Sequence, residues 1–442
     1  MKIQPVKGTR DFYPPQMAVR NWIIDGWKRV SVRNGFEEYD GPIFEYLDMY
    51  QIKSGEEIVE QLFSFEDRGG RKLAIRPEIT PTLARMVNQQ INSLPRPIKW
   101  FSVPRLCRAE RPQKGRLREF FQWNIDIIGV ENELGQVLAD AEVIFTTVDY
   151  LRGVGLTSKD IKVKISSREL LAAYLIGLGI PEDRLDSIYP VLDKKVKLPA
   201  ETFREVLNEQ VQDKQVVSKI LDFMNMDSLS DVEQSVRVGS DNFADCLRTV
   251  KDVLDKLTMM EVGDFCVYDP SIVRGLAYYT GIVFEVHDIG GELRAICGGG
   301  RYDNLLRDFG GPAVSATGMG MGDCVLEIVL REKGVLDRLL PEGKVDYFVA
   351  CVGVFGKEAW KVVERLRSAE YSVNFSYKMG GISRQLKEAS AQNAKKCIII
   401  GYDELKNNEL TVKDMTTGEQ ELVDYEEFLD SCLRRNDKAA QK

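Results

Sequence analysis

Residues 105–118, RLCRAERPQKGRLR, hold six Lys or Arg side chains and one Glu, although the whole chain has a formal net charge of −8. Arg108 and Glu110 have apolar neighbours, and a buried charge without a partner is costly. Because side chains alternate along a strand, we expect these two on one face. A guanidinium on a strand can bind a phosphate through two hydrogen bonds. The segment predicts an anion site for a triphosphate, although Lys114 and Arg116 alone would suit a solvated hairpin tip.

The stretch FFQWNIDIIG, which follows, alternates like a strand with one apolar and one polar face. The apolar face holds Phe121, Trp123, Ile125 and Ile127, and the polar face holds Gln122, Asn124 and Asp126. Upstream, Arg76 and Glu78 lie in the apolar run LAIRPEITPTLARM, where Thr80 and Pro81 begin an expected helix. A buried carboxylate requires a cation or an ammonium group. We expect two polar faces to meet across a hairpin.

The segment IVRGLAYYTGIVFE places Arg274 beside Gly275 and next to two tyrosines, Tyr278 and Tyr279. Read as a strand, it would direct the two tyrosines to opposite faces. An arginine beside a glycine suggests a ligand that lies against the backbone, because glycine allows a close approach. A core strand with a salt-bridged arginine is the alternative.

The segment ATGMGMGD carries glycine at 318, 320 and 322, a period of two that leaves one strand face without side chains. Such a face has room for a flat ring or a closely packed neighbour. It is not a phosphate-binding loop, because no GK[ST] follows and the glycines fall within the strand.

The composition excludes several kinds of catalytic site. His287 is the only histidine, so Ser-His-Asp hydrolysis and multi-histidine metal centres are excluded. The eight cysteines are at least 20 residues apart, which argues against metal knuckles and a disulfide framework. We expect no protein-bound metal cluster. No stretch reaches the ~20 apolar residues of a membrane span, and the N-terminus has no apolar signal core, so we expect a cytoplasmic protein with no membrane partner.

Hydrophobic periodicity predicts an α+β chain. A helix is expected at 17–34, extended chain at 35–50 and an antiparallel sheet across 73–128. Helical pieces fill 168–255. Strand patterns return at 272–297, after which GGGRYD should open a helix and GMGMG should form a strand.

From residue 345 the pattern becomes βαβ, which predicts a small, mostly parallel sheet. Residues 344–401 hold ten Lys or Arg against five Asp or Glu, so this part is either a solvated helix face or a polyanion-binding surface. We divide the chain into a core in two parts, 1–167 and 256–335, a helical insertion, 168–255, and a C-terminal α/β domain, 344–435.

Together these motifs resemble the class II aminoacyl-tRNA synthetases and, within them, the histidyl-tRNA synthetase family. The resemblance covers nearly the whole chain. It rests on KGTRDFYPP, IRPEITPTLARM, RAERPQKGRLREFFQWNIDIIG as motif 2, IVRGLAYYTGIVFE as the histidine signature, CGGGRYDNLL, GMGMGDCVLE as motif 3, and GYDELKNNELTVKD in the anticodon-binding domain.

The resemblance assigns roles to individual residues. It implies catalytic roles for Arg108, Arg274 and Gln122. It implies a histidine site of Glu78, Ile79, Thr80, Arg108, Gln122, Asp126, Arg274, Tyr278 and Tyr279. It implies an ATP site of Arg108, Glu110, Arg116 and Arg118. In this scheme Arg108 and Arg274 meet the α-phosphate and the reacting carboxylate, Glu110 meets the adenine amino group, and Asp126 and the two tyrosines contact the imidazole.

The same resemblance implies a reaction and its partners. The chain would activate L-histidine with ATP and Mg²⁺ to histidyl-adenylate, transfer it to the 3′ end of tRNA(His), and form a homodimer through its first helix and the GPIFEY strand. Val325 stands where motif 3 usually has an arginine, and Ile79, Phe121, Asp126 and Ala277 also depart from the commoner residues. The alternative is a non-catalytic, histidine-sensing regulatory subunit of ATP phosphoribosyltransferase, which typically lacks the C-terminal domain.

Overall fold

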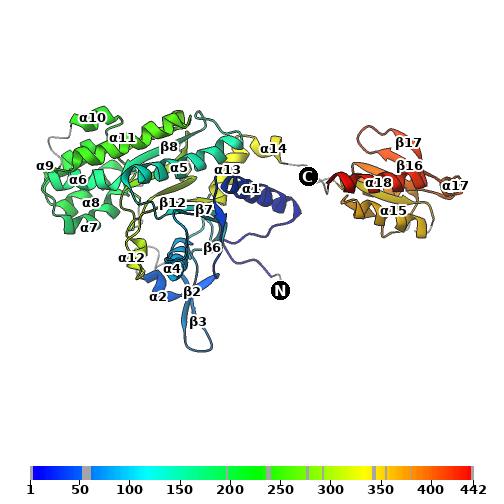
Figure 1. Ribbon diagram of the computed structural model, residues 1–442, viewed down its shortest axis with the longest axis horizontal. Helices are drawn as coiled ribbons and strands as arrows, with labels where there is room; N and C mark the ends of the chain where they lie inside the picture. The colour runs from blue at the N-terminus through cyan, green and yellow to red at the C-terminus, as the bar shows by residue number, and fades with distance from the viewer. Residues whose placement is uncertain are drawn as a thin grey trace. The chain divides into compact units, whose positions relative to one another are not determined.

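The chain forms two compact units, residues 1–340 and 341–442, each described here by itself (Figure 1). The computed structural model describes residues 3–51, 61–195, 198–234, 240–274, 278–290, 293–340, 345–353, 356–378 and 380–439, with side chains up to residue 432. Gly275, Ala277 and the expected domain start at 344 lie outside the described residues.

A nine-stranded sheet forms the centre of the first unit within the described residues, in the order β1-β5-β7-β12-β11-β10-β8-β9, with β6 paired to β7. Its strands are β1 Glu37–Glu38, β5 Ile98–Ser102, β6 Arg105–Cys107, β7 Glu119–Ile128, β8 Ile161–Ser167, β9 Cys266–Tyr268, β10 Ile282–Asp288, β11 Cys297–Arg301 and β12 Ala316–Gly322. Only the outer pairs β1–β5 and β8–β9 are parallel. The predicted α+β class with an antiparallel sheet is confirmed.

Helices cover this sheet, and a small sheet of order β2-β4-β3 extends from it. The small sheet consists of β2 Phe44–Tyr46, β3 Phe63–Glu66 and β4 Lys72–Ile75. The helices outside the segment 168–255 are α1 Pro14–Arg33, α2 Leu47–Gln51, α4 Thr80–Gln90, α5 Glu133–Gly153, α12 Leu305–Asp308, α13 Asp323–Glu332 and α14 Val335–Leu339. The predicted start of α4 at Thr80 is confirmed.

The segment 168–255 is helical, as predicted. It contains α6 Arg168–Gly177, a 3₁₀ turn Glu182–Arg184, α7 Leu185–Leu192, α8 Ala200–Val211, α9 Lys214–Phe223, α10 Leu229–Gln234 and α11 Phe243–Met259. Figure 1 shows these green helices grouped together at one side of the first unit, next to α5. The domain boundaries themselves remain a prediction.

The first helix is fixed to the sheet by an aromatic cluster. α1 starts with two prolines, which suit the first helical turn. Trp27 stacks against Trp123 of β7 at 6.2 Å between ring centroids, and Trp123 meets Tyr150 of α5 edge-on at 5.6 Å. Ser31 accepts a 2.8 Å hydrogen bond from Nε1 of Trp123 and donates one to the carbonyl of Trp27. The predicted apolar face of β7 therefore lies in the core.

The strand that carries the basic island is shorter than predicted. β6 ends at Cys107, so Arg108 and Glu110 lie in the segment after the strand and not in its interior. The backbone N–H of Arg108 still donates to the carbonyl of Arg118 at 2.8 Å. Pro112 has no backbone donor, which limits how far the pairing can continue. The expected extended chain at 35–50 likewise gives way to α2 at its end.

The expected strand at 272–281 is wrong. Its described residues are not in a strand, and β10 begins only at Ile282. Arg274 has a φ of 61°, in the left-handed region, which a strand cannot contain. The rings of Tyr278 and Tyr279 lie 5.0 Å apart and not on opposite faces. The helix expected to open at GGGRYD begins only after it, as α12 at Leu305, because CGGGR forms strand β11.

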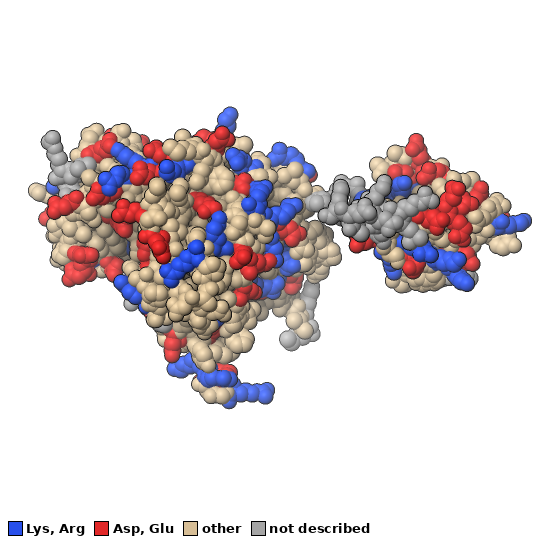
Figure 2. All heavy atoms as spheres, in the orientation of Figure 1, with Lys and Arg blue, Asp and Glu red and all other residues tan. Residues whose placement is uncertain are grey.

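The second unit is a five-stranded sheet of order β14-β13-β15-β16-β17 within the described residues, with helices on both faces. Its elements are β13 Tyr347–Cys351, α15 Lys357–Ser368, β14 Val373–Phe375, α16 Ile382–Ala391, β15 Lys396–Ile400, α17 Tyr402–Lys406, β16 Glu409–Asp414, β17 Gln420–Asp424 and α18 Tyr425–Ala439. The sheet is mixed, not mostly parallel, because β16 and β17 add antiparallel pairs. In the view of Figure 2, Lys and Arg side chains gather along the edge that carries α15.

Among the described residues, no helix is both long and apolar enough to span a bilayer. The eight cysteines are free thiols, five of them buried. Burial raises the pKa of Cys297 and Cys324 well above the ordinary range. These thiols are therefore protonated and contribute to packing.

The aromatic cluster yields a stability prediction. Ser31→Ala would leave the buried Nε1–H of Trp123 without an acceptor, and we expect a loss of about 1–3 kcal/mol in the free energy of unfolding. Urea unfolding followed by tryptophan fluorescence measures it. In a Trp123→Phe background the same change should cost much less, because no donor is left unpaired. Thr249→Ala, which removes an exposed hydroxyl bonded to the carbonyl of Asp245, is the control. Equal losses of unfolding free energy in the two backgrounds would contradict the role of Ser31 as the acceptor for Trp123.

Candidate active site

A cavity of about 910 Å³ opens in the first unit against one face of the central sheet. Most residues proposed from the sequence line it: Glu78, Thr80, Arg108, Glu110, Arg116, Gln122, Asp126, Arg274, Tyr278 and Tyr279. They come from β7 and from the segments that follow β4 and β6 or precede β10. Arg108 and Arg274, which lie 166 positions apart in the sequence, therefore meet in one cavity.

The floor of the cavity is the polar face of β7 beside the glycine face of β12. In the register of this pair, Gly318 lies opposite Asp126, and Gly322 lies opposite Gln122. A Cβ on Gly318 would collide with the Asp126 carboxylate and lie 2.8 Å from the carbonyl oxygen of Ile125. The expectation of a strand face without side chains is confirmed. Its consequence is space for the polar side chains of the neighbouring strand.

Asp126 is buried, and its carboxylate is only partly satisfied. One oxygen accepts a hydrogen bond from the hydroxyl of Tyr302, and the other has no partner in the described part of the chain. Burial raises the pKa of Asp126 from 3.8 to about 7, and the Tyr302 bond offsets only part of that rise. The group is therefore poised to change its charge near neutral pH and to accept one more hydrogen bond.

Glu78 is a second buried carboxylate with an unused oxygen. The hydroxyl of Tyr278 donates to its Oε2 at 3.2 Å, whereas no described residue forms a hydrogen bond with its buried Oε1. Burial raises the pKa of Glu78, and the nearby charge of Arg108 opposes the shift. An ammonium group at Oε1 would satisfy this carboxylate. The burial of Glu78 beside the charge of Arg108 agrees with the expectation that a carboxylate in this run needs a cation.

The basic island forms the wall beside β6 and β7. Arg108 donates from Nε to the carbonyl of Pro77 at 3.0 Å, and its guanidinium lies 5.2 Å from the ring centroid of Phe120. Burial lowers the pKa of Arg108, although Glu78 opposes the shift. Arg116 is paired with Glu110, so it is not part of a freely solvated hairpin tip. One oxygen of Glu110 remains buried with no partner among the described residues.

Arg274 also lines the cavity and is held by an ion pair. Its NH1 is 2.6 Å from Oε1 of Glu285, and Nε2 of His287 is 2.9 Å from the other oxygen of that carboxylate. Burial would raise the pKa of Glu285, but Arg274 and His287 outweigh it and hold the pKa at about 2. The carboxylate is therefore charged at neutral pH.

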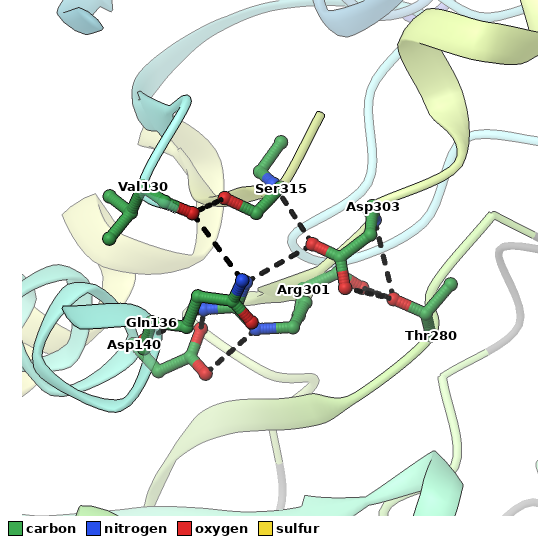
Figure 3. A network of polar contacts seen from close by, with 8 residues as sticks. Val130, Gln136, Asp140, Thr280, Arg301, Asp303 and Ser315 are labelled. Carbon is green, nitrogen blue, oxygen red and sulfur yellow. Dashed lines mark hydrogen bonds and ion pairs between the residues drawn. The ribbon is translucent and has the colours of Figure 1, made fainter. Parts of the chain in front are cut away.

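A buried polar network centres on Arg301 and includes the segment that follows Tyr279 (Figure 3). Arg301, the last residue of β11, bonds to both oxygens of Asp140 in α5 at 2.9 and 3.0 Å and to Asp303 at 3.1 Å. Asp303 in turn accepts from the hydroxyl of Thr280 at 3.2 Å and from the backbone N–H of Ala316 at 3.0 Å. The network ties the segment after Tyr279 to β11, β12 and α5.

Two residues proposed for the site lie away from the cavity wall. Ile79 is fully buried among the apolar side chains around α4, because the helix start turns its side chain into the core. Arg118 donates to the backbone carbonyls of Glu110 and Lys7, so its guanidinium stabilises the turn. Neither side chain is positioned to line the cavity in this structure.

Several residues on the cavity wall were not proposed from the sequence. They include Asn124, Lys162, Lys164, Glu285, His287, Arg294 and Tyr302. Glu285 could have been found by the argument used for Arg108, since it is a charge in an apolar strand. Tyr302 lies in the quoted CGGGRYDNLL segment, but its hydroxyl contact spans 176 residues of sequence, which no local pattern encodes.

The cavity is thus lined by guanidinium groups, by carboxylate oxygens without a hydrogen-bond partner among the described residues, and by aromatic rings. Such a set can neutralise phosphates, hold an ammonium group and read a polar ring by hydrogen bonding. The described residues contain no group of three or more His, Cys, Asp or Glu side chains that could hold a metal ion by themselves.

Comparison with known proteins agrees with this chemistry. A histidyl-tRNA synthetase family model matches residues 8–322, and an anticodon-binding domain model matches residues 346–435. A histidine–tRNA ligase of Opitutus terrae is 39% identical over 416 residues, covering 94% of this chain and 94% of the relative. The chloroplastic/mitochondrial histidine–tRNA ligase of Arabidopsis thaliana is 38% identical over 419 residues, covering 95% of this chain and 84% of the relative.

Solved structures share the fold. Histidyl-tRNA synthetase from Nostoc sp. superposes with a TM-score of 0.81 at 24% identity, covering 98% of this chain and 100% of that one. A Bacillus halodurans protein described as an ATP phosphoribosyltransferase regulatory subunit/histidyl-tRNA synthetase gives 0.74 at 21% identity, covering 90% and 98%. At these identities the solved structures support a shared fold alone. The family is shown by the model match and the sequence relatives: the chain belongs to the histidyl-tRNA synthetase family.

Proposed function

We propose that the cavity of the first unit is the site where this chain activates L-histidine with ATP. Membership of the family makes the chain an aminoacyl-tRNA synthetase with histidine–tRNA ligase activity. The observation that carries the location is the convergence of Arg108 and Arg274 on one cavity that also holds two carboxylates with unused oxygens. These are the charges that a nucleotide and an amino acid would complement.

In the proposed reaction the carboxylate of histidine attacks the α-phosphorus of ATP. A carbon–oxygen–phosphorus linkage forms, the bond to the β-phosphate oxygen breaks, and pyrophosphate leaves. Arg108 and Arg274, which line the same cavity, would approach the reacting carboxylate and α-phosphate and stabilise the charge that accumulates there. This electrostatic catalysis needs no general base.

The amino acid would be recognised by groups that the cavity leaves unsatisfied. The α-ammonium group would meet Oε1 of Glu78, close to Thr80 and Gln122. The imidazole would donate to the free oxygen of Asp126, beside the rings of Tyr278 and Tyr279. An apolar side chain would leave this carboxylate unpaired, so the site would reject it by a factor of roughly 10⁴.

The remaining parts of the proposal follow the family. Mg²⁺ would enter as part of the substrate, bound to the ATP phosphates, as is usual for this ion. The second unit would bind the anticodon of tRNA(His), with the basic edge at α15 as the favoured electrostatic contact. The chain would act as a cytoplasmic homodimer. Exposed Phe44, Tyr46 and Phe65 on the small sheet supply an apolar surface for a second copy.

Histidine-dependent ATP–pyrophosphate exchange tests the site. We expect exchange by the wild type in the presence of Mg²⁺, and a loss of roughly 10²–10³ in rate for Arg274→Ala, because a cation at the reacting phosphate is removed. Arg331→Ala, which breaks an exposed pair with Glu327 in α13, should leave exchange intact. Undiminished exchange by Arg274→Ala would refute its role. No exchange by the folded wild type would favour the regulatory-subunit alternative.

The pKa of Asp126 predicts how stability depends on pH. Folded Asp126 keeps its proton to about pH 7, whereas the unfolded chain loses it near pH 3.8, so ionisation destabilises the folded state increasingly as pH rises between these values. We expect Asp126→Asn to be more stable than wild type at pH 8, with an advantage on the order of 2–3 kcal/mol larger than at pH 5. Thermal unfolding across this range measures it.

The same variant should bind histidine more weakly, since an amide accepts a weaker hydrogen bond than a carboxylate does. Asp227→Asn, at an exposed site away from the cavity, is the control and should leave histidine binding unchanged. A pH-independent difference for Asp126→Asn would show that its carboxyl does not titrate as inferred.

A further inference from the structure

We propose that Glu285 is a positioning residue for Arg274, and that catalysis depends on it through this arginine. The inference rests on the proposed function, in which Arg274 meets the reacting phosphate. Its structural basis is the 2.6 Å ion pair between NH1 of Arg274 and Oε1 of Glu285 at the edge of the cavity. Both side chains are about four-fifths buried, with relative exposures of 19% and 21%.

The backbone of Arg274 does little by itself to fix the position of the guanidinium. Its φ of 61° lies in a region that residues other than glycine rarely adopt, and it belongs to no strand or helix. An arginine side chain also has several rotatable bonds, so a lone guanidinium would sample many positions. Transition-state stabilisation requires a fixed one. The side chains that contact the guanidinium must therefore fix its position.

Glu285 is well placed to do so, because it lies in the middle of β10. Its strand pairs with β8 on one side and β11 on the other, where Glu285 is opposite Lys164 and Gly298, respectively. The Oε2 atom is held by Nε2 of His287, two residues along the same strand face. Both carboxylate oxygens are engaged, so its orientation is set. With a pKa of about 2, the carboxylate also stays charged at every pH at which the enzyme would work.

The neighbours of Arg274 complete a slot for its guanidinium. A Cβ on Gly298 would lie 2.5 Å from NH1, so only glycine leaves room there. The guanidinium carbon lies 5.6 Å from the ring centroid of Tyr279. Glu285 pairs with NH1, and the side chain of Tyr279 also hydrogen-bonds to the guanidinium. Both contacts hold the guanidinium at the cavity wall, which Arg274 lines together with Glu285 and Tyr279.

A double-mutant cycle tests whether Glu285 acts through Arg274. We expect Glu285→Ala to lower kcat for pyrophosphate exchange by roughly 10- to 100-fold in the wild-type background, and by less than about twofold in the Arg274→Ala background. Glu285→Gln, which keeps an oxygen to accept from NH1, should retain more activity than Glu285→Ala. If Glu285 only supported the fold of the cavity, Glu285→Ala would lower kcat by the same factor in both backgrounds.

The controls separate the possible failures. Glu142→Ala breaks a 2.6 Å pair with Lys99 away from the cavity and should leave exchange unchanged. Thermal unfolding of each variant shows whether it is folded, and Glu285→Gln carries the test if Glu285→Ala is not. Additive losses, or full exchange by Glu285→Ala, would overturn the proposal for Glu285. Full exchange by Arg274→Ala alone would instead overturn the proposed function.

Discussion

The cavity of the first unit is built around buried carboxyl groups that the protein itself pairs only in part. Glu78 and Asp126 are buried, and each keeps one oxygen without a partner in the described structure. Such groups cost folding free energy, because desolvation is not repaid by hydrogen bonds. The cost can persist because the cluster of Trp27, Trp123 and Tyr150 and the Arg301 network hold the surrounding elements in place. A ligand that supplies an ammonium group and a ring N–H recovers that free energy as affinity.

The glycine face of β12 is what allows polar groups to lie on a sheet at the centre of the unit. On the neighbouring strand β7, Gln122, Asn124 and Asp126 lie on the same side of the sheet. The other face of β7 packs Trp123 and Ile125 into the core. A side chain at Gly318 would occupy the space of the Asp126 carboxylate. One strand therefore both builds the hydrophobic core and carries part of the binding site, so that mutations on its two faces should affect different properties.

How much the sequence predicts depends on how local the signal is. The alternation in β7 placed Trp123 in the core and Asp126 in the cavity, because a period of two fixes which face a side chain takes. Arg274 was assigned to the right cavity but to the wrong backbone, since a left-handed residue leaves no periodic trace. Its partner Glu285 and the partner of Asp126, Tyr302, were missed as such because these contacts depend on strand order and register, which residue types alone do not specify.

Val325 stands where the family resemblance predicts an arginine in motif 3, so another residue would have to supply positive charge to that part of the cavity. Val325 lines the cavity, and a Cβ on Gly115 would come within 3.0 Å of it, so the turn of the basic island packs against this side chain. Arg118 donates to the backbone carbonyls of Glu110 and Lys7, whereas Arg116 lines the cavity. Arg116 is paired with Glu110, so a triphosphate would compete with that carboxylate for it. In the proposed site, positive charge for the outer phosphates would then come from the turn of the basic island and not from helix α13.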